Sequence, residues 1–278
     1  RNILRSIIFS CSIIAVAVFV AVGSRMIRSG DGRTNKYDVE AGNNTYDNAV
    51  IENSKISGKN KIQNNQSMLD DIMNSTQYPK QLKDLALKNE EALEFVYDYP
   101  TEHVKEHTID LTEEASMDSV PLFVQWDKRW GYEKYSGNFF AASGCGPTTL
   151  SMVVVYLTHN REASPIAVAK YSKEAGYSVD GSGSSWTLIS EGCMHYGVKA
   201  KAVALDESRM KAELDEGRPI VVNVGPGDFT DTGHFMVITG YDDEGFSIND
   251  PNSIEKSGKR WLFRNISSQI RAVWSMYV

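Results

Sequence analysis

The sequence has few cysteines and a deficit of positive charge, and each shortage excludes a class of protein. Its three cysteines, at positions 11, 145 and 193, are too few for a disulfide framework or for a zinc site of four thiolates. Lysine and arginine number 29 against 36 aspartates and glutamates, which gives a net charge of −7. Nucleic acid is therefore not expected as the main partner, because binding phosphates requires a clustered positive surface.

The remaining composition is that of a folded protein. Apolar residues make up 41% of the 278 residues and charged residues 23%, so the chain can bury a core. At about 100–200 residues per domain, this length allows one large domain or two small ones.

An uncharged segment stands near the beginning of the sequence. Residues 6–24 are mostly apolar, and arginines lie on both sides of them, at positions 1, 5, 25 and 28. At a rise of about 1.5 Å per residue, a helix of this length nearly spans a hydrocarbon core of ~30 Å. Two hypotheses fit: an uncleaved membrane anchor over residues 1–28, which we favour, and a signal peptide cut after residues 21–23. Both export the rest of the chain, which is acidic.

Two further segments precede the larger part of the chain. Residues 29–66 are rich in Asn, Gly, Ser and Lys and poor in large apolar residues, so we predict a flexible stalk. Helical signals begin at Ser67, which together with the acidic residue three positions later resembles a capping box. Pro79 suits the first position of a second helix, and Asn89 can cap a third. Residues 67–117 are therefore predicted to form a helical lead-in that packs on the larger part of the chain.

In residues 118–278, helical patterns come first and strand patterns come after them. This order predicts an α+β fold in which helices pack against an antiparallel sheet. The acidic and glycine residues at 242–245 predict a hairpin turn between two strands. The predicted helices span 145–157, 165–175, 185–196 and 207–216, and the predicted strands span 219–224, 234–241, 246–249 and 272–278.

One cysteine stands where a helix is predicted to begin. Cys145 is flanked by Gly144 and Gly146 and precedes an apolar run with helical spacing. At a helix N-terminus, the helix dipole and unpaired N–H groups lower the pKa of a thiol. The two glycines allow backbone or substrate to approach closely. A buried structural cysteine beside a helix cap is the alternative.

A histidine and an acid fall at the far ends of the strands that the hairpin joins. His234 begins the first strand and Asp250 ends the second, so the two can lie near each other across an antiparallel pair. A carboxylate beside an imidazole fixes the tautomer and the orientation of the ring. Cys145, His234 and Asp250 thus supply a nucleophile, a base and an orienting group.

These residues lie in motifs that resemble a known family. The pattern "VPLFVQWDKRWG … SGCGPTTLSMV … GHFMVITGYDDEGFSINDP" is similar to the papain-like cysteine peptidases, in the branch related to double-glycine leader peptidases of bacteriocin export. The resemblance covers residues 118–278. The preceding "YPKQLKDLALKNEEALEFVYDYP" resembles a helical lead-in of exported, stand-alone members from Gram-positive bacteria.

The resemblance implies a papain-like fold and one further site residue. In such enzymes a glutamine upstream of the nucleophile donates its amide to the oxyanion, and Gln125 stands at the matching position. The export transporters also carry an ATPase, but this sequence has no GxxxxGK[ST] phosphate loop. Nothing therefore supports a nucleotide partner, and specificity for a double-glycine site does not carry over.

Other residues receive smaller roles. Trp186 follows a Gly/Ser-rich loop and is a candidate substrate contact, as are Gly144 and Gly146. Cys193 and His195 do not face each other on a helix and are not expected to act together. A disulfide between Cys145 and Cys193 is an alternative that would abolish a thiol mechanism. No metal site is expected.

The sequence therefore predicts a cell-surface or secreted thiol peptidase that uses Cys145, His234, Asp250 and Gln125 and passes through an acyl-enzyme intermediate. Its partners are a peptide or protein substrate and, through the N-terminal helix, the membrane; no cofactor is needed. Hydrolysis of cell-wall peptides by the same residues is one alternative. A catalytically inactive surface binding module with the same fold is the other.

Overall fold

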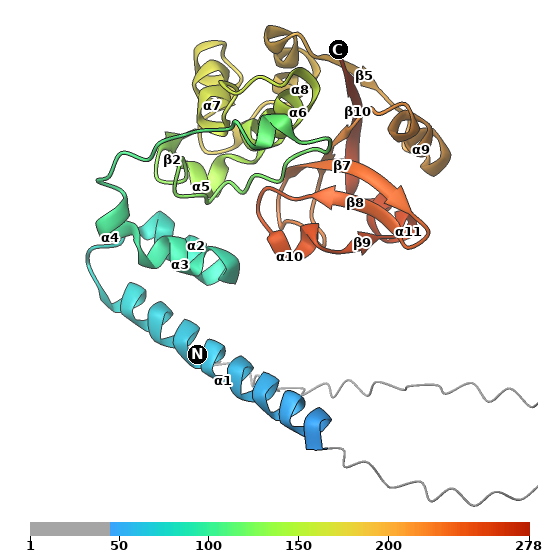
Figure 1. Ribbon diagram of the computed structural model, residues 1–278. Coiled ribbons are helices and arrows are strands. Elements are labelled where there is room, and N and C mark those ends of the chain that lie inside the picture. The colour runs from blue at the N-terminus through green and yellow to red at the C-terminus, as the bar shows by residue number, and fades with distance from the viewer. Residues whose placement is uncertain (1–44) are drawn as a thin grey trace, which may run out of the picture. The chain divides into compact units, whose positions relative to one another are not determined.

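The computed structural model describes residues 45–278, with side chains from residue 60 onward (Figure 1). The predicted membrane anchor or signal peptide, at residues 6–24, lies outside the described residues. Among the helices that are described, none is both long and apolar enough to cross a membrane. Residues Ile51–Val278 form one compact unit.

The described chain begins with a long helix where a flexible stalk was expected. Helix α1 runs from Thr45 to Asn74, so residues 45–66 are helical and Ser67 lies inside a helix rather than at its start. Near its end, α1 buries Ile72 and packs Met68 and Leu69 against the helices after it. A helix that is fixed at one end extends easily, because each added residue gains a backbone hydrogen bond. Composition alone does not show that the end of α1 is held by packing against later helices.

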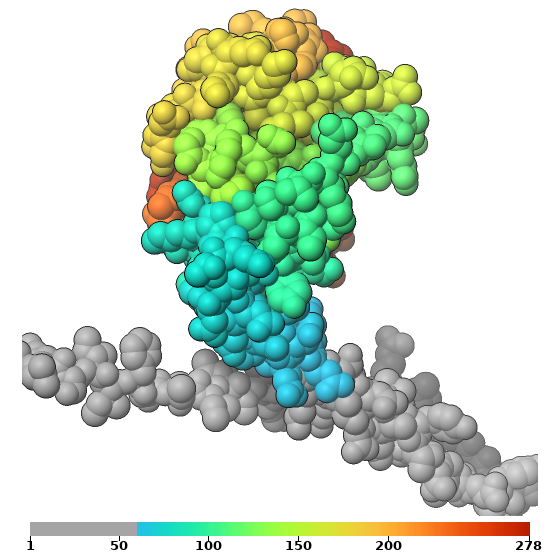
Figure 2. Space-filling model, turned by 90° about the vertical axis from the view of Figure 1, so that its left-hand side faces the viewer, coloured from blue at the N-terminus to red at the C-terminus, as the bar shows by residue number. Residues whose placement is uncertain are grey.

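The lead-in continues through short helices that share a small core. Pro79 precedes α2 as its N-cap residue, and the side chain of Asn89 accepts a hydrogen bond from the N–H of Glu91, as the cap prediction required. Apolar side chains of these helices pack against Phe139 and Ala141, just ahead of Cys145. In Figure 2 the cyan surface of the lead-in continues into the green surface of the next segment. The lead-in comprises α2 (Lys80–Lys88), η1 (Glu90–Ala92), α3 (Leu93–Tyr97) and α4 (Tyr99–Glu102).

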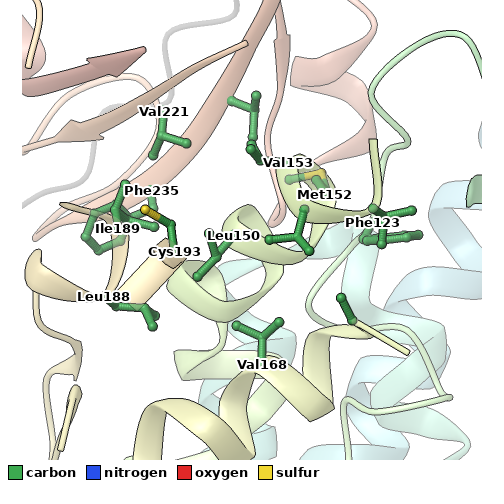
Figure 3. Close-up of a cluster of buried hydrophobic side chains, with 14 of the residues drawn as sticks. Phe123, Leu150, Met152, Val153, Val168, Leu188, Ile189, Cys193, Val221 and Phe235 are labelled. Carbon is green, nitrogen blue, oxygen red and sulfur yellow. The ribbon is translucent and has the colours of Figure 1, made fainter. Parts of the chain in front are cut away.

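The central helix of the larger part is α6, which runs from Cys145 to Thr158. It is apolar on all sides and correspondingly buried, as expected for a helix enclosed by other elements. Its residues Leu150, Met152 and Val153 lie in one hydrophobic cluster with Phe123 and Val168 (Figure 3). The elements around it are η2 (Glu114–Ser116), α5 (Phe140–Ser143), α7 (Pro165–Glu174), α8 (Thr187–Ser190) and η3 (Gly192–Tyr196), with the short hairpins β1 (Lys134–Tyr135), β2 (Asn138–Phe139), β3 (Ser178–Val179) and β4 (Gly183–Ser184).

One predicted helix is interrupted. The sequence predicts a helix over 185–196, but α8 ends at Ser190 and η3 begins at Gly192. The break coincides with a close approach: a Cβ on Gly192 would lie 3.0 Å from the ring of Tyr177. A side chain at residue 192 would crowd that ring, and helical periodicity carries no signal for this contact.

The second half of the chain forms an antiparallel sheet of six strands in the order β5–β10–β6–β7–β8–β9. The four predicted strands are β6, β7, β8 and β10, and the predicted hairpin joins β7 to β8 at Asp242 and Gly245. The sequence did not predict β5 and β9, which are short edge strands with little apolar pattern. The strands are β5 (Lys199–Ala202), β6 (Ile220–Val224), β7 (His234–Asp242), β8 (Gly245–Asn249), β9 (Arg260–Trp261) and β10 (Ile270–Tyr277).

Alternating side chains give the sheet two apolar faces. Val221 and Val237 join the cluster around α6, whereas Val222 and Ile238 join a second cluster on the opposite face. The second face is covered by α9 (Glu207–Asp215) and α11 (Phe263–Ile266), while α10 (Ile254–Ser257) and η4 (Ser267–Gln269) lie in the connections after β8 and before β10. The molecule is thus a mixed fold of helices packed on an antiparallel sheet (Figure 1).

Candidate active site

The thiol of Cys145 lies at the first residue of α6, after the N-cap residue Gly144. It is partly exposed and lines a cleft of about 670 Å³, which we call the Cys145 cleft; the loop 181–184, Trp186 and residues 223–226 form its other walls. Burial raises the pKa of this thiol, but the imidazole of His234 and the N–H groups of Phe235 and Gly146 outweigh burial and lower it. The site therefore favours a thiolate.

His234 is the first residue of β7 and is only 6% exposed. Its Nε2–H donates a hydrogen bond of 2.7 Å to Oδ1 of Asp250. Burial lowers the pKa of His234, but the charge of Asp250, its hydrogen bond and the Cys145 thiol raise it to about 10. Because Nε2 is engaged by Asp250, Nδ1 is the ring nitrogen left for the Cys145 sulfur. The pair is thus arranged as thiolate and imidazolium.

Asp250 follows the end of β8 and is fully buried. Its Oδ1 also accepts the N–H of Asn252 at 2.8 Å, and its own N–H donates to Ser257 Oγ at 2.9 Å. The β7–β8 register pairs Val237 with Asn249, which brings the start of one strand beside the end of the other. The antiparallel pairing predicted from the sequence therefore brings His234 and Asp250 together.

Gln125 is buried between the two halves of the site, at 4% exposure. Its backbone N–H donates to the carbonyl of Pro251 at 2.7 Å, next to Asp250. Its side-chain Nε2 donates to the carbonyl of Ala141 at 2.7 Å, four residues before the thiol, and its Oε1 has no partner. One of the two amide N–H groups thus remains available. The expected hydrogen bond to an oxyanion stays a prediction.

Close packing explains why glycine stands on both sides of Cys145. A Cβ on Gly144 would lie 2.5 Å from the ring of Phe140, and a Cβ on Gly146 would lie 2.5 Å from Ser184 Oγ. Neither glycine lines the Cys145 cleft, so their contact with substrate stays a prediction. Trp186 does line it: its ring is 47% exposed and packs edge-on against Trp274 at 6.1 Å between centroids.

Sequence reasoning missed Asn223. This buried side chain lies in the Cys145 cleft and donates from Nδ2 to the carbonyl of His234 at 3.2 Å, so it helps to fix the backbone of that histidine. Its sequence signal was a single amide inside the apolar run of β6.

The alternative disulfide does not form. Cys145 and Cys193 are both free, and Cys193 is buried in the cluster around α6, where burial raises its pKa to about 11 (Figure 3). His195 instead stacks on Tyr171, with 4.1 Å between ring centroids. Cys193 is therefore a core residue, and the thiol of Cys145 remains free for chemistry.

Comparisons with known proteins find two similar solved structures and one family profile. The peptidase domain of Streptococcus ComA, a bifunctional ABC transporter of a quorum-sensing pathway, is 19% identical with a TM-score of 0.41. A Bacillus anthracis protein described as a C39-like peptidase is 16% identical with a TM-score of 0.36. Each match covers 57% of this chain, and 96% and 95% of the other chain respectively. No curated protein matches the sequence.

The profile of the Peptidase_C39 like family matches residues 117–278, more than half of the chain. The protein therefore belongs to the Peptidase_C39 like family.

Proposed function

We propose that the protein hydrolyses peptide bonds with the thiolate of Cys145. The observation that supports this most strongly is the buried 2.7 Å contact between His234 and Asp250 beside a thiol whose pKa is lowered. A helix N-terminus, a charged imidazole and a buried carboxylate together hold the negative charge on sulfur before substrate arrives.

The first half of the reaction transfers an acyl group to the enzyme. The sulfur of Cys145 attacks the carbonyl carbon, a C–S bond forms, and the carbonyl electrons move onto oxygen. The free N–H of the Gln125 amide and the backbone N–H of Cys145 stabilise this oxyanion. When the intermediate collapses, the C–N bond breaks and His234 gives its proton to the leaving amine.

The second half releases the acid and restores the site. His234, now neutral, accepts a proton from water as the water attacks the thioester. Collapse of that intermediate breaks the C–S bond and regenerates the thiolate and imidazolium. Asp250 keeps the imidazole oriented throughout, because its Oδ1 holds Nε2 and is itself fixed by Asn252.

Alkylation by iodoacetamide at neutral pH tests the activated thiol. We expect Cys145 to react at least about tenfold faster than an unperturbed thiol, and His234→Ala to remove this advantage. Cys193 is an internal control, because a buried thiol with a raised pKa stays unmodified. A Cys145 that reacts slowly and ignores the histidine substitution contradicts the proposal and favours the binding module.

We further propose that the protein acts outside the cell, held at the membrane by residues 6–24. The support is the uncharged apolar run between arginines in the sequence. Fractionation with N-terminal sequencing tests this: an intact N-terminus in membranes supports the anchor. A new N-terminus at Ser24 supports secretion, and a cytoplasmic protein contradicts both.

A further inference from the structure

The Cys145 cleft is almost uncharged. Of the described residues that line it, the only ionisable side chains are those of Cys145 and Arg271. Asp228 and Asp231 line a neighbouring hollow and not this cleft. A peptide in the cleft therefore meets one guanidinium cation and, apart from the thiolate, no negative group among the side chains that line it.

A β-bulge places Arg271 outside the regular pairing of β10. Ile270 pairs with Val224 and Ala272 pairs with Asn223, so Arg271 is the extra residue between two consecutive partners. Ile270 belongs to the cluster on one face of the sheet and Ala272 packs against the cluster on the other, whereas residues two apart in a regular strand share a face. The bulge thus frees Arg271 from both apolar faces and directs its side chain into the wall of the cleft.

Gly225 leaves room for the guanidinium beside the cleft. A Cβ at Gly225 would lie 2.8 Å from Arg271 Nε and 3.1 Å from Nη2, so the guanidinium lies against backbone that has no side chain. The group is held at one end, because Nη1 donates to the carbonyl of Ser268 at 2.8 Å. Its position in the wall is therefore set by the backbone on both sides.

The rest of the guanidinium is available to a ligand. Within residues 60–278, Arg271 makes no ion pair, and the arginines that do are those at positions 129, 218 and 260. A guanidinium has five N–H donors in a planar fork, and two of them can bind the two oxygens of one carboxylate. The ligand that best fits this wall is thus a carboxylate.

The bulge lies close to the bond that is cut. Val224 pairs with Ile270 on one side and with His234 on the other, so the backbones of residues 270 and 234 are two strand spacings apart, about 10 Å. An extended peptide advances about 3.4 Å per residue. Because His234 acts at the cut bond, a substrate group that reaches Arg271 belongs to a residue within about three positions of that bond.

We infer that Arg271 binds a carboxylate of the peptide substrate in the Cys145 cleft, and that the protein thereby selects peptides with an acidic residue near the cut bond. The inference rests on the proposed peptidase function and adds to it a class of substrate. Arg271 is a specificity residue in this scheme and takes no part in the chemical steps at Cys145.

A library of random decapeptides, with cut sites identified by mass spectrometry, tests this on the chain of residues 1–278. The wild type should prefer Asp and Glu over Lys and Arg by about fivefold at one or two adjacent positions near the cut. Arg271→Gln should remove this preference, and Arg271→Glu should reverse it, because attraction becomes repulsion. Since the side chain is exposed, salt at about 0.5 M should weaken the preference of the wild type.

Libraries with free and with amidated C-termini distinguish the source of the carboxylate. A preference that is equal in both comes from Asp and Glu side chains, which is the expected result. A preference that appears only with free C-termini, as cuts near the end of the peptide, assigns the terminal carboxylate to Arg271 instead. In either case the preference must depend on Arg271.

Arg209→Glu is the matched control, because it makes the same change of charge on α9, which packs on the other face of the sheet. It should leave the profile unchanged. Thermal melting and alkylation of Cys145 show whether each variant keeps its fold and its thiol, and Arg271→Gln carries the test if Arg271→Glu does not fold.

A wild-type protein that cuts peptides without an acidic preference overturns this inference and leaves the proposed function standing. A preference that survives the substitution of Arg271 does the same. A folded wild-type protein that cuts no peptide contradicts the proposed function itself and this inference with it.

Discussion

At the scale of residues, Cys145 and His234 are two ionisable side chains, each of which fixes the protonation of the other. The thiol of Cys145 raises the pKa of His234, and the imidazole of His234 lowers the pKa of Cys145. The carboxylate of Asp250, bonded to the other ring nitrogen, also raises the pKa of His234. The proposed mechanism therefore requires the pH range in which the sulfur has lost its proton and the ring has kept its own.

Hydrolysis and alkylation should depend differently on pH. As pH rises through about 10, His234 loses the proton that the leaving amine needs, so hydrolysis falls while alkylation of the thiolate continues. Asp250→Asn removes the charge that raises the pKa of His234, so the alkaline limb of hydrolysis should move to lower pH. The exposed Asp243→Asn in the β7–β8 turn is the control. Parallel alkaline limbs for both reactions contradict the assigned roles.

Gln125 should affect only the step in which an oxyanion forms. We expect Gln125→Ala to lower kcat for peptide hydrolysis by about 10²–10³-fold, the usual effect of losing one oxyanion donor. Alkylation of Cys145 makes no oxyanion, so its rate should stay near that of the wild type. Thermal melting shows whether the buried site tolerates the change. An equal loss in both reactions means that Gln125 supports the thiolate or the fold instead.

The site residues that the sequence predicted have strong local signals. Cys145 follows a glycine at a helix start, and the short β7–β8 hairpin fixes which ends of its strands meet. Asn223 has only a weak signal, a single amide in an apolar run, because its importance depends on a neighbour distant in the sequence. Residues 223 and 234 meet through the pairing of β6 with β7.

At the scale of elements, the lead-in is joined to the loop that carries Asp250. The carboxylate of Glu91 accepts hydrogen bonds from the Ser253 hydroxyl, from Ile254 N–H at 2.7 Å and from Glu255 N–H at 3.0 Å. It thereby caps the N-terminus of α10, three to five residues after Asp250. More than 160 residues separate the cap from its helix, so no local pattern predicts it.

Removal of the Glu91 side chain should leave the carboxylate of Asp250 less firmly positioned. We expect Glu91→Ala to lower the free energy of unfolding by about 1 kcal/mol, as for loss of a capping side chain. It should also shift the alkaline limb of hydrolysis toward lower pH, because Asp250 then holds His234 less firmly. Glu94→Ala, on the exposed side of α3, is the control. Lower stability with an unshifted pH profile would reduce Glu91 to a purely structural role.

Element boundaries show where sequence reasoning stops. The start of α6 and the extents of β6 and β7 are set by apolar patterns and agree with the structure to within one residue. The extension of α1 through residues 45–66 and the break before Gly192 depend on tertiary contacts. Composition and periodicity describe a segment by itself, and so they miss both.

At the scale of the whole molecule, the lead-in and the catalytic part share a core. Leu85 on α2 packs in the cluster that also contains Phe139 and Ala141. We therefore expect residues 51–278 to unfold in one transition, and Leu85→Ala to destabilise it by about 2–5 kcal/mol. Leu87→Ala, on the same helix but 57% exposed, should have almost no effect. Two separate melting transitions, with only one responding to Leu85→Ala, would contradict a shared core.

The backbone hydrogen bond from Gln125 to Pro251 is one of several between the segment before Cys145 and the residues at the end of β8. Asn249 Nδ2 donates to the carbonyls of Val120 and Pro121, and Trp126 Nε1 donates to that of Asn252 at 3.2 Å. These hydrogen bonds fix residues 120–126, which precede the thiol, to the end of β8 and the residues directly after it. Residues 120–126 and 249–252 cannot move apart without breaking these hydrogen bonds. We therefore expect selection among peptides to depend on the side chains that line the Cys145 cleft rather than on an opening of the fold.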